Sequence, residues 1–158
     1  MVSKQRSIGT RFETACVGYL RRTLMDDRIE RRALHGNKDM GDIFGLSVHG
    51  NKGIVECKSV KRIGRLLLDE FREQTVNERD NADADFALLV IHKAGVGDKR
   101  FGENDCQMQI RDLEKIAGGS FTCLAGDSAR DMWVSMTLGD ACRIMTDDFG
   151  DDGDDDGD

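Results

Sequence analysis

Three residues between positions 42 and 58 carry side chains suited to phosphate chemistry. Asp42 begins a short apolar run, and Glu56 and Lys58 stand two positions apart in a second one, after a glycine- and asparagine-rich turn through residues 49–53. Two such runs joined by a turn predict a β-hairpin. Because strand side chains alternate between faces, Glu56 and Lys58 point the same way and Asp42 can lie beside Glu56 across the pair. Cys57 points to the opposite, apolar face.

Two carboxylates beside an ammonium indicate a site for a divalent cation in a phosphodiesterase. Carboxylate oxygens are the hard ligands that Mg²⁺ prefers, and Mn²⁺ suits the same ligands. A lysine beside them can orient or deprotonate the attacking water, or stabilise charge on a phosphoryl oxygen. Asp39 is a rival to Asp42, which we prefer because it begins an apolar strand whereas Asp39 lies in a polar loop. The simpler alternative is an exposed strand whose charges only meet solvent.

Basic residues precede and follow this hairpin. Residues 28–40 predict a short edge strand and then a glycine-containing loop that leads into the hairpin. The basic side chains either clamp phosphates near the cation or form an ordinary solvated face. The candidates for DNA binding are Arg11, Arg31, Arg32, Lys38, Lys61 and Arg62.

Residues 7–25 show the periodicity of an amphipathic helix. Its apolar stripe consists of Ile8, Phe12, Cys16, Tyr19 and Leu20. Glu13 falls close to this stripe, where an unpaired carboxylate would be costly to bury. Either Glu13 lies at the edge of the stripe and meets Arg11, Arg21 or solvent, or it reaches the cation held by the hairpin carboxylates.

Residues 65–81 predict a second amphipathic helix. Its inward residues are Leu67, Leu68 and Phe71. Gln74 or Glu70 can lean toward the carboxylates, but we place both, together with Glu78, on the solvent side of the helix.

The apolar run at residues 85–92 predicts a strand that is covered on both faces, at the centre of the sheet. Trp133 is interpreted as an anchor in the core or in a dimer interface. The remaining expectations are a flexible loop at 94–106, an element of unsettled type at 107–117, a strand at 131–138 and a helix at 139–146.

Length and composition predict one domain over residues 1–146 and a disordered Asp/Gly tail over 147–158. Residues 1–65 hold 14 Lys/Arg against 7 Asp/Glu, residues 66–146 hold 9 against 15, and the tail holds 8 aspartates and no base. A basic first part fits a polyanionic substrate in spite of the net charge of −7. The tail either keeps the protein soluble or competes with DNA for the basic groove.

Cysteine spacing and hydropathy limit the compartment and the partners. The five cysteines are scattered and contain no C-x-x-C pair, so they indicate neither a zinc site nor a disulfide framework. No apolar run approaches the roughly 20 residues of a membrane span, and the basic N-terminus lacks the apolar stretch of a signal peptide. We expect a cytoplasmic protein, in the host cytoplasm if a phage encodes it, with no membrane partner and no organic cofactor.

Three segments that follow the helix of Glu13 resemble the PD-(D/E)XK nuclease superfamily. The chain is most similar there to the Holliday junction resolvases of archaea and to related proteins of actinobacterial phages, over roughly residues 8–93. Gly41 stands where the motif has its namesake proline, as in many members. The segments are Asp39-Met40-Gly41-Asp42-Ile43, Glu56-Cys57-Lys58 and Asn81-Ala82-Asp83-Ala84.

This resemblance implies an α/β fold of the restriction-endonuclease type, in which helices flank a mixed central sheet. It implies that Asp42 and Glu56 bind Mg²⁺, with the backbone carbonyl of Cys57 as a further ligand. Lys58 would position or activate the water, and Glu13 would complete the site, directly or through water. The resemblance also implies a homodimer, because two symmetric cuts need two sites.

We therefore expect a Mg²⁺-dependent endonuclease that acts on branched DNA, most closely a Holliday junction resolvase in phage DNA recombination or processing. Such a protein can recognise the shape and charge of the backbone without reading sequence. Two alternatives remain open. One is a broader repair or restriction-like nuclease that cuts flaps, ends or single strands, and the other is a DNA-binding module without activity.

Overall fold

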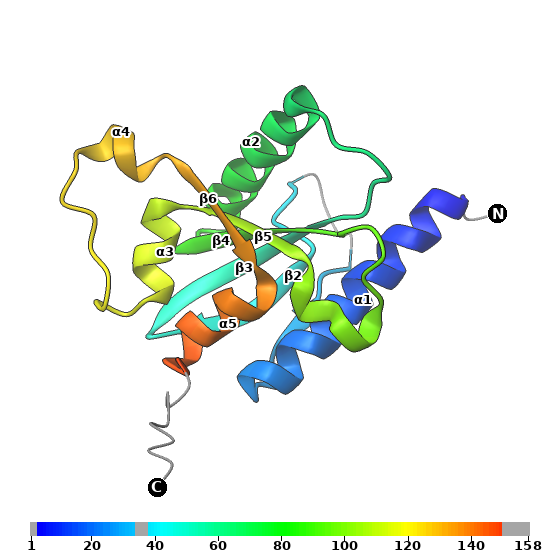
Figure 1. The fold of residues 1–158 in the computed structure, drawn as a ribbon, viewed down its shortest axis with the longest axis horizontal. Coiled ribbons are helices and arrows are strands. Elements are labelled where there is room, and N and C mark those ends of the chain that lie inside the picture. The colour runs from blue at the N-terminus through cyan, green and yellow to red at the C-terminus, as the bar shows by residue number, and fades with distance from the viewer. Residues whose placement is uncertain (1–2, 34–37, 150–158) are drawn as a thin grey trace, which may run out of the picture.

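A six-stranded mixed sheet forms the centre of the protein in a computed structural model that describes residues 3–33 and 38–149 (Figure 1). The strands lie side by side in their order along the chain. All neighbours are antiparallel except β3 and β4, which are parallel and need a crossover. The strands are β1 (Glu30–Arg31), β2 (Ile43–Val48), β3 (Asn51–Lys58), β4 (Phe86–Ile91), β5 (Asp105–Gln109) and β6 (Trp133–Thr137).

Helices cover both faces of this sheet. Helix α2 makes the crossover between β3 and β4, while α1 and α5 pack against each other and against the sheet. Side chains of β3 therefore alternate between α2 on one face and α1 on the other. The helices are α1 (Lys4–Leu24), α2 (Arg65–Asn81), the 3-10 helix η1 (Asp98–Glu103), α3 (Ile110–Ile116), α4 (Asp127–Arg130) and α5 (Leu138–Thr146).

The core follows the predicted apolar runs. All six residues of β4 are buried, which confirms that the run at 85–92 is a central strand. Helix α1 buries Phe12, Cys16 and Leu20 against the sheet, while Ile8 is exposed. All five cysteines are free, and four of them are buried. The α/β class and the mixed sheet are as predicted.

Among the described residues, no helix combines the length and the apolar character needed to cross a membrane.

The β2–β3 hairpin turns more tightly than its sequence predicted. Only His49 and Gly50 form the turn, both with positive φ, and residues 51–53 already pair with β2. The register shifts within β2 at a bulge, where Gly45 has a φ of +89°. A Cβ at this glycine would lie 2.2 Å from the carbonyl oxygen of Arg28, so the bulge requires glycine.

Two other expectations need correction or completion. The segment at 94–106 is not simply a flexible loop, because it contains η1, which is anchored by Phe101 buried 5.2 Å from the ring of Phe12. The unsettled segment at 107–117 divides into the end of β5 and helix α3. Phe101, an apolar residue in a polar stretch, holds η1 against α1, and the sequence pattern did not predict this contact.

Some predicted segments fall partly outside the described residues. The edge strand expected within 28–40 is only two residues long, and residues 34–37 of the loop that follows lie outside the described part. Residues 150–158 of the predicted tail lie outside it as well. Within the described part, α5 ends at Thr146, where the predicted domain ends.

Candidate metal centre

The hairpin places Asp42 directly beside Glu56. The backbone amide of Asp42 donates to the carbonyl of Val55 at 3.0 Å, which continues the β2–β3 pairing. The Asp42 carboxylate then accepts a 2.8 Å hydrogen bond from the amide of Cys57. Since the amide and carbonyl of one strand residue point to the same side, the carbonyl of Cys57 faces the Asp42 side of β3. The predicted adjacency of Asp42 and Glu56 is confirmed.

Lys58 lies on the same face of β3 as Glu56, as the alternation of the strand predicted. Its ammonium contacts Glu56 Oε1 at 2.6 Å and lies 5.0 Å above the ring of Phe71 on α2. Burial lowers the pKa of Lys58, but the charges of Glu56, Asp42 and Glu78 outweigh it, so the net shift is upward. Lys58 is therefore held as an ammonium ion, suited to charge stabilisation and orientation.

Helix α2 contributes two residues that the sequence had placed on the solvent side. Gln74 accepts a 2.9 Å hydrogen bond from Lys58 and donates to Glu78 at 2.7 Å and to Glu56 at 3.4 Å. Glu78 is only 1% exposed. The prediction that these two side chains face solvent is wrong, whereas Glu70 is exposed as expected. A signal for them existed, because Gln74 and Glu78 continue the inward stripe of Phe71 at helical spacing.

The pKa values of the carboxyl groups are raised well above their usual range. Burial is the largest cause for Asp42, followed by the charge of Glu56, and together they raise its pKa to about 8. Burial raises the pKa of Glu56 to about 8, together with the hydrogen bond that it forms with Glu78 when one of the two is protonated, although Lys58 opposes this. The pKa of Glu78 is raised mainly by burial, with Asp39 adding to it. These negative groups lack sufficient positive charge, which favours a proton or a cation among them.

Two carboxylate oxygens in this group show where a cation would fit. Glu56 Oε2 and Glu78 Oε2 are both buried and have no hydrogen-bond partner among the described residues. A buried oxygen without a partner is costly, and a hard divalent cation would satisfy it. No three His, Cys, Asp or Glu side chains converge on one point in residues 3–33 and 38–149. Of the two glutamates, Glu56 lies beside Asp42, and these two carboxylates, with the Cys57 carbonyl and waters, would hold the Mg²⁺ ion that the resemblance implies.

Glu13 lies near this group but pairs with a different residue from those expected. Its carboxylate forms a 3.1 Å ion pair with Arg31 on β1, rather than with Arg11 or Arg21. The guanidinium of Arg21 instead donates to the carbonyl of Ile29 at 2.6 Å. Glu13 is nevertheless close enough for its charge to contribute to the raised pKa of Asp42. Its contact with a bound cation, direct or through water, stays a prediction.

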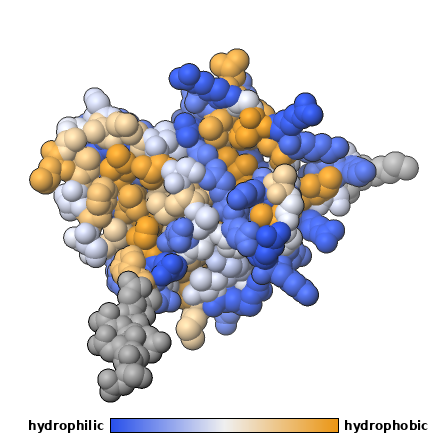
Figure 2. Space-filling model, viewed as in Figure 1, coloured by the Kyte–Doolittle hydropathy of each residue, from blue (hydrophilic) through white to orange (hydrophobic). Residues whose placement is uncertain are grey.

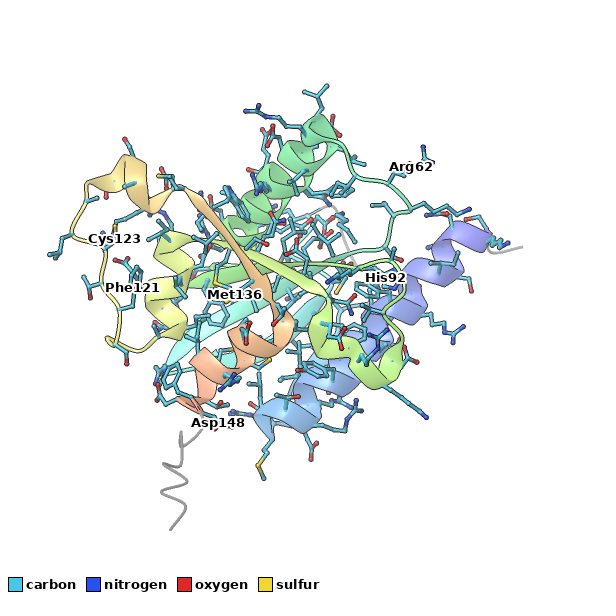
Figure 3. All side chains as sticks on the ribbon, viewed as in Figure 1. Arg62, His92, Phe121, Cys123, Met136 and Asp148 are labelled. Atoms are coloured by element: carbon cyan, nitrogen blue, oxygen red, sulfur yellow. The ribbon has the colours of Figure 1, made fainter. Side chains whose placement is uncertain are left out.

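The predicted DNA-binding residues differ in how free they are. Arg11, Lys38, Lys61 and Arg62 are exposed, and Arg62 projects from the segment between β3 and α2, away from the body of the molecule (Figure 3). Arg32 is half-buried, with its guanidinium 4.8 Å above the ring of Phe44. Its backbone amide donates to the carbonyl of Asp42 at 2.7 Å, which places this basic segment beside the carboxylates.

The two ends of the molecule have different surfaces. Figure 2 shows mostly hydrophilic side chains over α1 and the segment that leads into α2, and more apolar ones over α3, α4 and their connection. Exposed apolar residues of that second region include Phe121, Leu124 and Met132. Trp133 is half-buried, with the guanidinium of Arg72 5.3 Å from its ring, and its role as an anchor of the core or of a dimer stays a prediction.

Comparison with known proteins adds no family assignment. No protein-family model, no curated protein and no solved structure matches the chain significantly.

Proposed function

We propose that this chain is a Mg²⁺-dependent endonuclease that hydrolyses phosphodiesters of branched DNA, with the four-way Holliday junction as its substrate. The observation that carries the proposal is the convergence of Asp42, Glu56 and Lys58 at the open end of the β2–β3 hairpin, opposite its turn. The resemblance of the same residues to PD-(D/E)XK nucleases supports it. A merely exposed charged strand would not bury Glu56 to 3% exposure.

The side chains have separable roles in this reaction. When bound by Asp42 and Glu56, Mg²⁺ supplies Lewis-acid stabilisation of the phosphoryl charge and an activated water. The ammonium of Lys58 is fixed by Glu56 and Gln74, so it can orient the water or stabilise charge on the phosphoryl oxygen. Glu13 would hold a further water at the edge of the site.

The basic surface beside the centre supports a polyanionic substrate. Arg11, Lys61 and Arg62 are exposed, so they are free to contact phosphates. We expect Arg62→Ala to weaken binding to all DNA forms alike and to lower the slope of log affinity against log salt by about 1. Fluorescence anisotropy over a salt series measures this slope, and an unchanged slope would remove Arg62 from the interface.

Recognition of a four-way junction further implies a homodimer in the cytoplasm, or in the host cytoplasm for a phage protein, because two symmetric cuts need two sites. The restriction-endonuclease type of fold belongs to the same proposal. The expected disorder of the tail is wrong for residues 147–149, because Arg143 donates hydrogen bonds to the carbonyls of Asp148 and Phe149, and residues 150–158 lie outside the described part. The proposed reaction uses no organic cofactor, and the proposal includes no membrane partner.

The experiment that tests the proposal is cleavage of a synthetic four-way junction. Duplex, flap and single-stranded DNA serve as control substrates, each with Mg²⁺, Mn²⁺ or EDTA, and Glu56→Ala is assayed in parallel. Paired symmetric nicks in the junction, dependent on the metal and absent in Glu56→Ala, are the expected result.

Other outcomes separate the alternatives. Metal-dependent cutting of flaps, ends or single strands at comparable rates would keep the catalytic centre but replace the junction resolvase with a broader nuclease. Binding of DNA with no cutting under any condition would leave a DNA-binding module, and the proposed activity would be rejected.

A further inference from the structure

The contact between Glu56 and Glu78 is not explained by a single cation at Asp42 and Glu56. Both glutamates are at most 3% exposed, and each has one buried oxygen without a hydrogen-bond partner among the described residues. Their carboxyl groups are close enough to hydrogen-bond to each other when one of them is protonated. Two buried carboxylates within hydrogen-bonding reach of each other repel unless a positive species lies between or beside them.

The Lys58 ammonium lowers the pKa of Glu78 through its charge, but its close contacts are with other side chains. The Lys58 ammonium contacts Glu56 Oε1 at 2.6 Å and Gln74 Oε1 at 2.9 Å. Gln74 then donates its amide to Glu78 Oε1, a neutral hydrogen bond that fixes one oxygen and leaves Oε2 unpaired. Asp39, whose charge also acts on Glu78, adds a further negative group on the outer side.

A pocket of about 310 Å³ opens beside Glu78 on the α2 side of the centre. Every residue that lines it carries a side-chain oxygen, and none is basic. Asp39, Glu73 and Asn77 belong to this lining together with Gln74 and Glu78. A hydrated cation can therefore approach Glu78 through an oxygen-rich opening and keep several of its waters, as Mg²⁺ does when one or two carboxylates bind it.

We infer that Glu78 and Glu56 together hold a second divalent cation, which enters from this pocket and lies on the opposite side of Glu56 from the cation at Asp42. This inference rests on the proposed function for the first cation. Glu56 is shared by the two positions, and Gln74 orients Glu78 toward the second one. The ligand class is a hard, oxygen-binding divalent ion, Mg²⁺ or Mn²⁺.

The test counts bound Mn²⁺ on the full chain in the absence of DNA, from the free-ion signal in electron paramagnetic resonance. The proteins compared are the wild type, Glu78→Gln, and Asp69→Asn as a matched control that makes the same charge change at an exposed residue of the same helix outside the pocket lining. We expect two ions on the wild type and on Asp69→Asn. Glu78→Gln should bind the second ion at least tenfold more weakly.

A second variant guards against a loss of folding, which circular dichroism would reveal. Glu78→Asp keeps the charge on a shorter side chain, and it should bind the second ion several-fold more weakly than the wild type. If the folded Glu78 variants bind Mn²⁺ in the same number and with the same affinity as the wild type, the glutamates share a proton and the inference is rejected.

The first and second cations can fail separately. One bound ion on the wild type, lost in Asp42→Ala and retained in Glu78→Gln, would overturn the second site and leave the proposed centre standing. No bound ion on the wild type would reject both.

Discussion

Helix α2 joins two buried acidic groups that are built in opposite ways. At Asp112 every carboxylate oxygen has donors: Arg79 at 3.0 and 3.2 Å, the amide of Gln109 at 3.1 Å and the amide of Ala87 at 3.3 Å. At Glu56 on β3 and Glu78, the α2 residue directly before Arg79, each carboxylate keeps a buried oxygen without a hydrogen-bond partner among the described residues. Both groups are almost fully buried, so burial does not distinguish them.

The difference separates a structural group from a candidate functional one. Asp112 is the third residue of α3 and forms a capping box with Gln109, so its charge holds α3 and α2 together. Its pKa is raised by burial while Arg79 lowers it. Glu78 instead raises the pKa of Glu56, and the fold keeps the two carboxyl groups together although apolar residues would fill the space more stably. Unsatisfied buried charge of this kind is expected where a ligand completes the site.

The largest effect that we expect is on cleavage. Asp42→Asn should lower the cleavage rate at least about 100-fold, since it removes a ligand charge at nearly constant shape. Asp112→Asn makes the same chemical change at the carboxylate that Arg79 pairs with. The folded fraction of this variant should cut at close to the wild-type rate. Single-turnover cleavage of the junction measures both, and equal losses in the two variants would remove the distinction between the groups.

Of the two acidic groups, the ion pair between Asp112 and Arg79 should contribute more to the free energy of unfolding. Asp112→Ala leaves the Arg79 guanidinium buried without its partner, which we expect to lower the free energy of unfolding by about 3–5 kcal/mol. Glu78→Gln removes repulsion, so the metal-free protein should be as stable as the wild type or more stable. Urea unfolding in EDTA compares them, and a larger loss for Glu78→Gln than for Asp112→Ala would contradict the comparison.

Stability of the metal-free protein should fall as the pH rises from about 4.5 to about 8. In this window the native state keeps protons on Asp42 and Glu56, whose pKa values are about 8, whereas the unfolded chain has lost them. Stability then decreases with pH, by at most about 1.4 kcal/mol per pH unit for each carboxyl. Below the unfolded pKa values and above about pH 8 these two groups contribute no slope.

Urea unfolding in EDTA at pH 5, 6, 7 and 8 measures this slope. Glu56→Gln should flatten it, because one of the two groups no longer titrates. A saturating concentration of Mg²⁺ should flatten it as well, because the cation replaces the protons. If the stability of the metal-free protein rises from pH 5 to 8, the pKa values of Asp42 and Glu56 are not both raised.

An exposed ion pair should matter least. Arg100 and Glu103 lie 3.1 Å apart in η1 with side chains 59% and 48% exposed. Glu103→Ala should change the free energy of unfolding by less than about 0.5 kcal/mol, because solvent screens both charges. The same urea series serves for this variant. A loss comparable to that of Asp112→Ala would mean that burial is not what separates these pairs.

The β2–β3 hairpin was largely predictable because its geometry is local. Strand alternation placed Glu56 with Lys58 and apart from Cys57, and the antiparallel turn placed Asp42 beside Glu56. These relations need only the period of a strand and a short connection. The central strand at 85–92 followed in the same way from an unbroken apolar run.

The remainder of the centre comes from contacts between distant segments. Gln74 and Glu78 were assigned to solvent because polar residues on a helix are usually exposed, and only the packing of α2 against β3 showed otherwise. The partner of Glu13 was missed for the same reason, because Arg31 is distant in sequence and becomes a neighbour only when β1 joins the sheet.

The sequence by itself determined which groups can do chemistry and which strands carry them, because side-chain direction within one strand or hairpin is fixed by backbone geometry. Tertiary structure alone decided how those charges are balanced. The energy of a buried carboxylate depends on which donors and charges surround it, and those arrive from other elements. Asp112 and Glu78 are similar acids on helices, and only the fold supplies an arginine to one and leaves the other facing a second carboxylate.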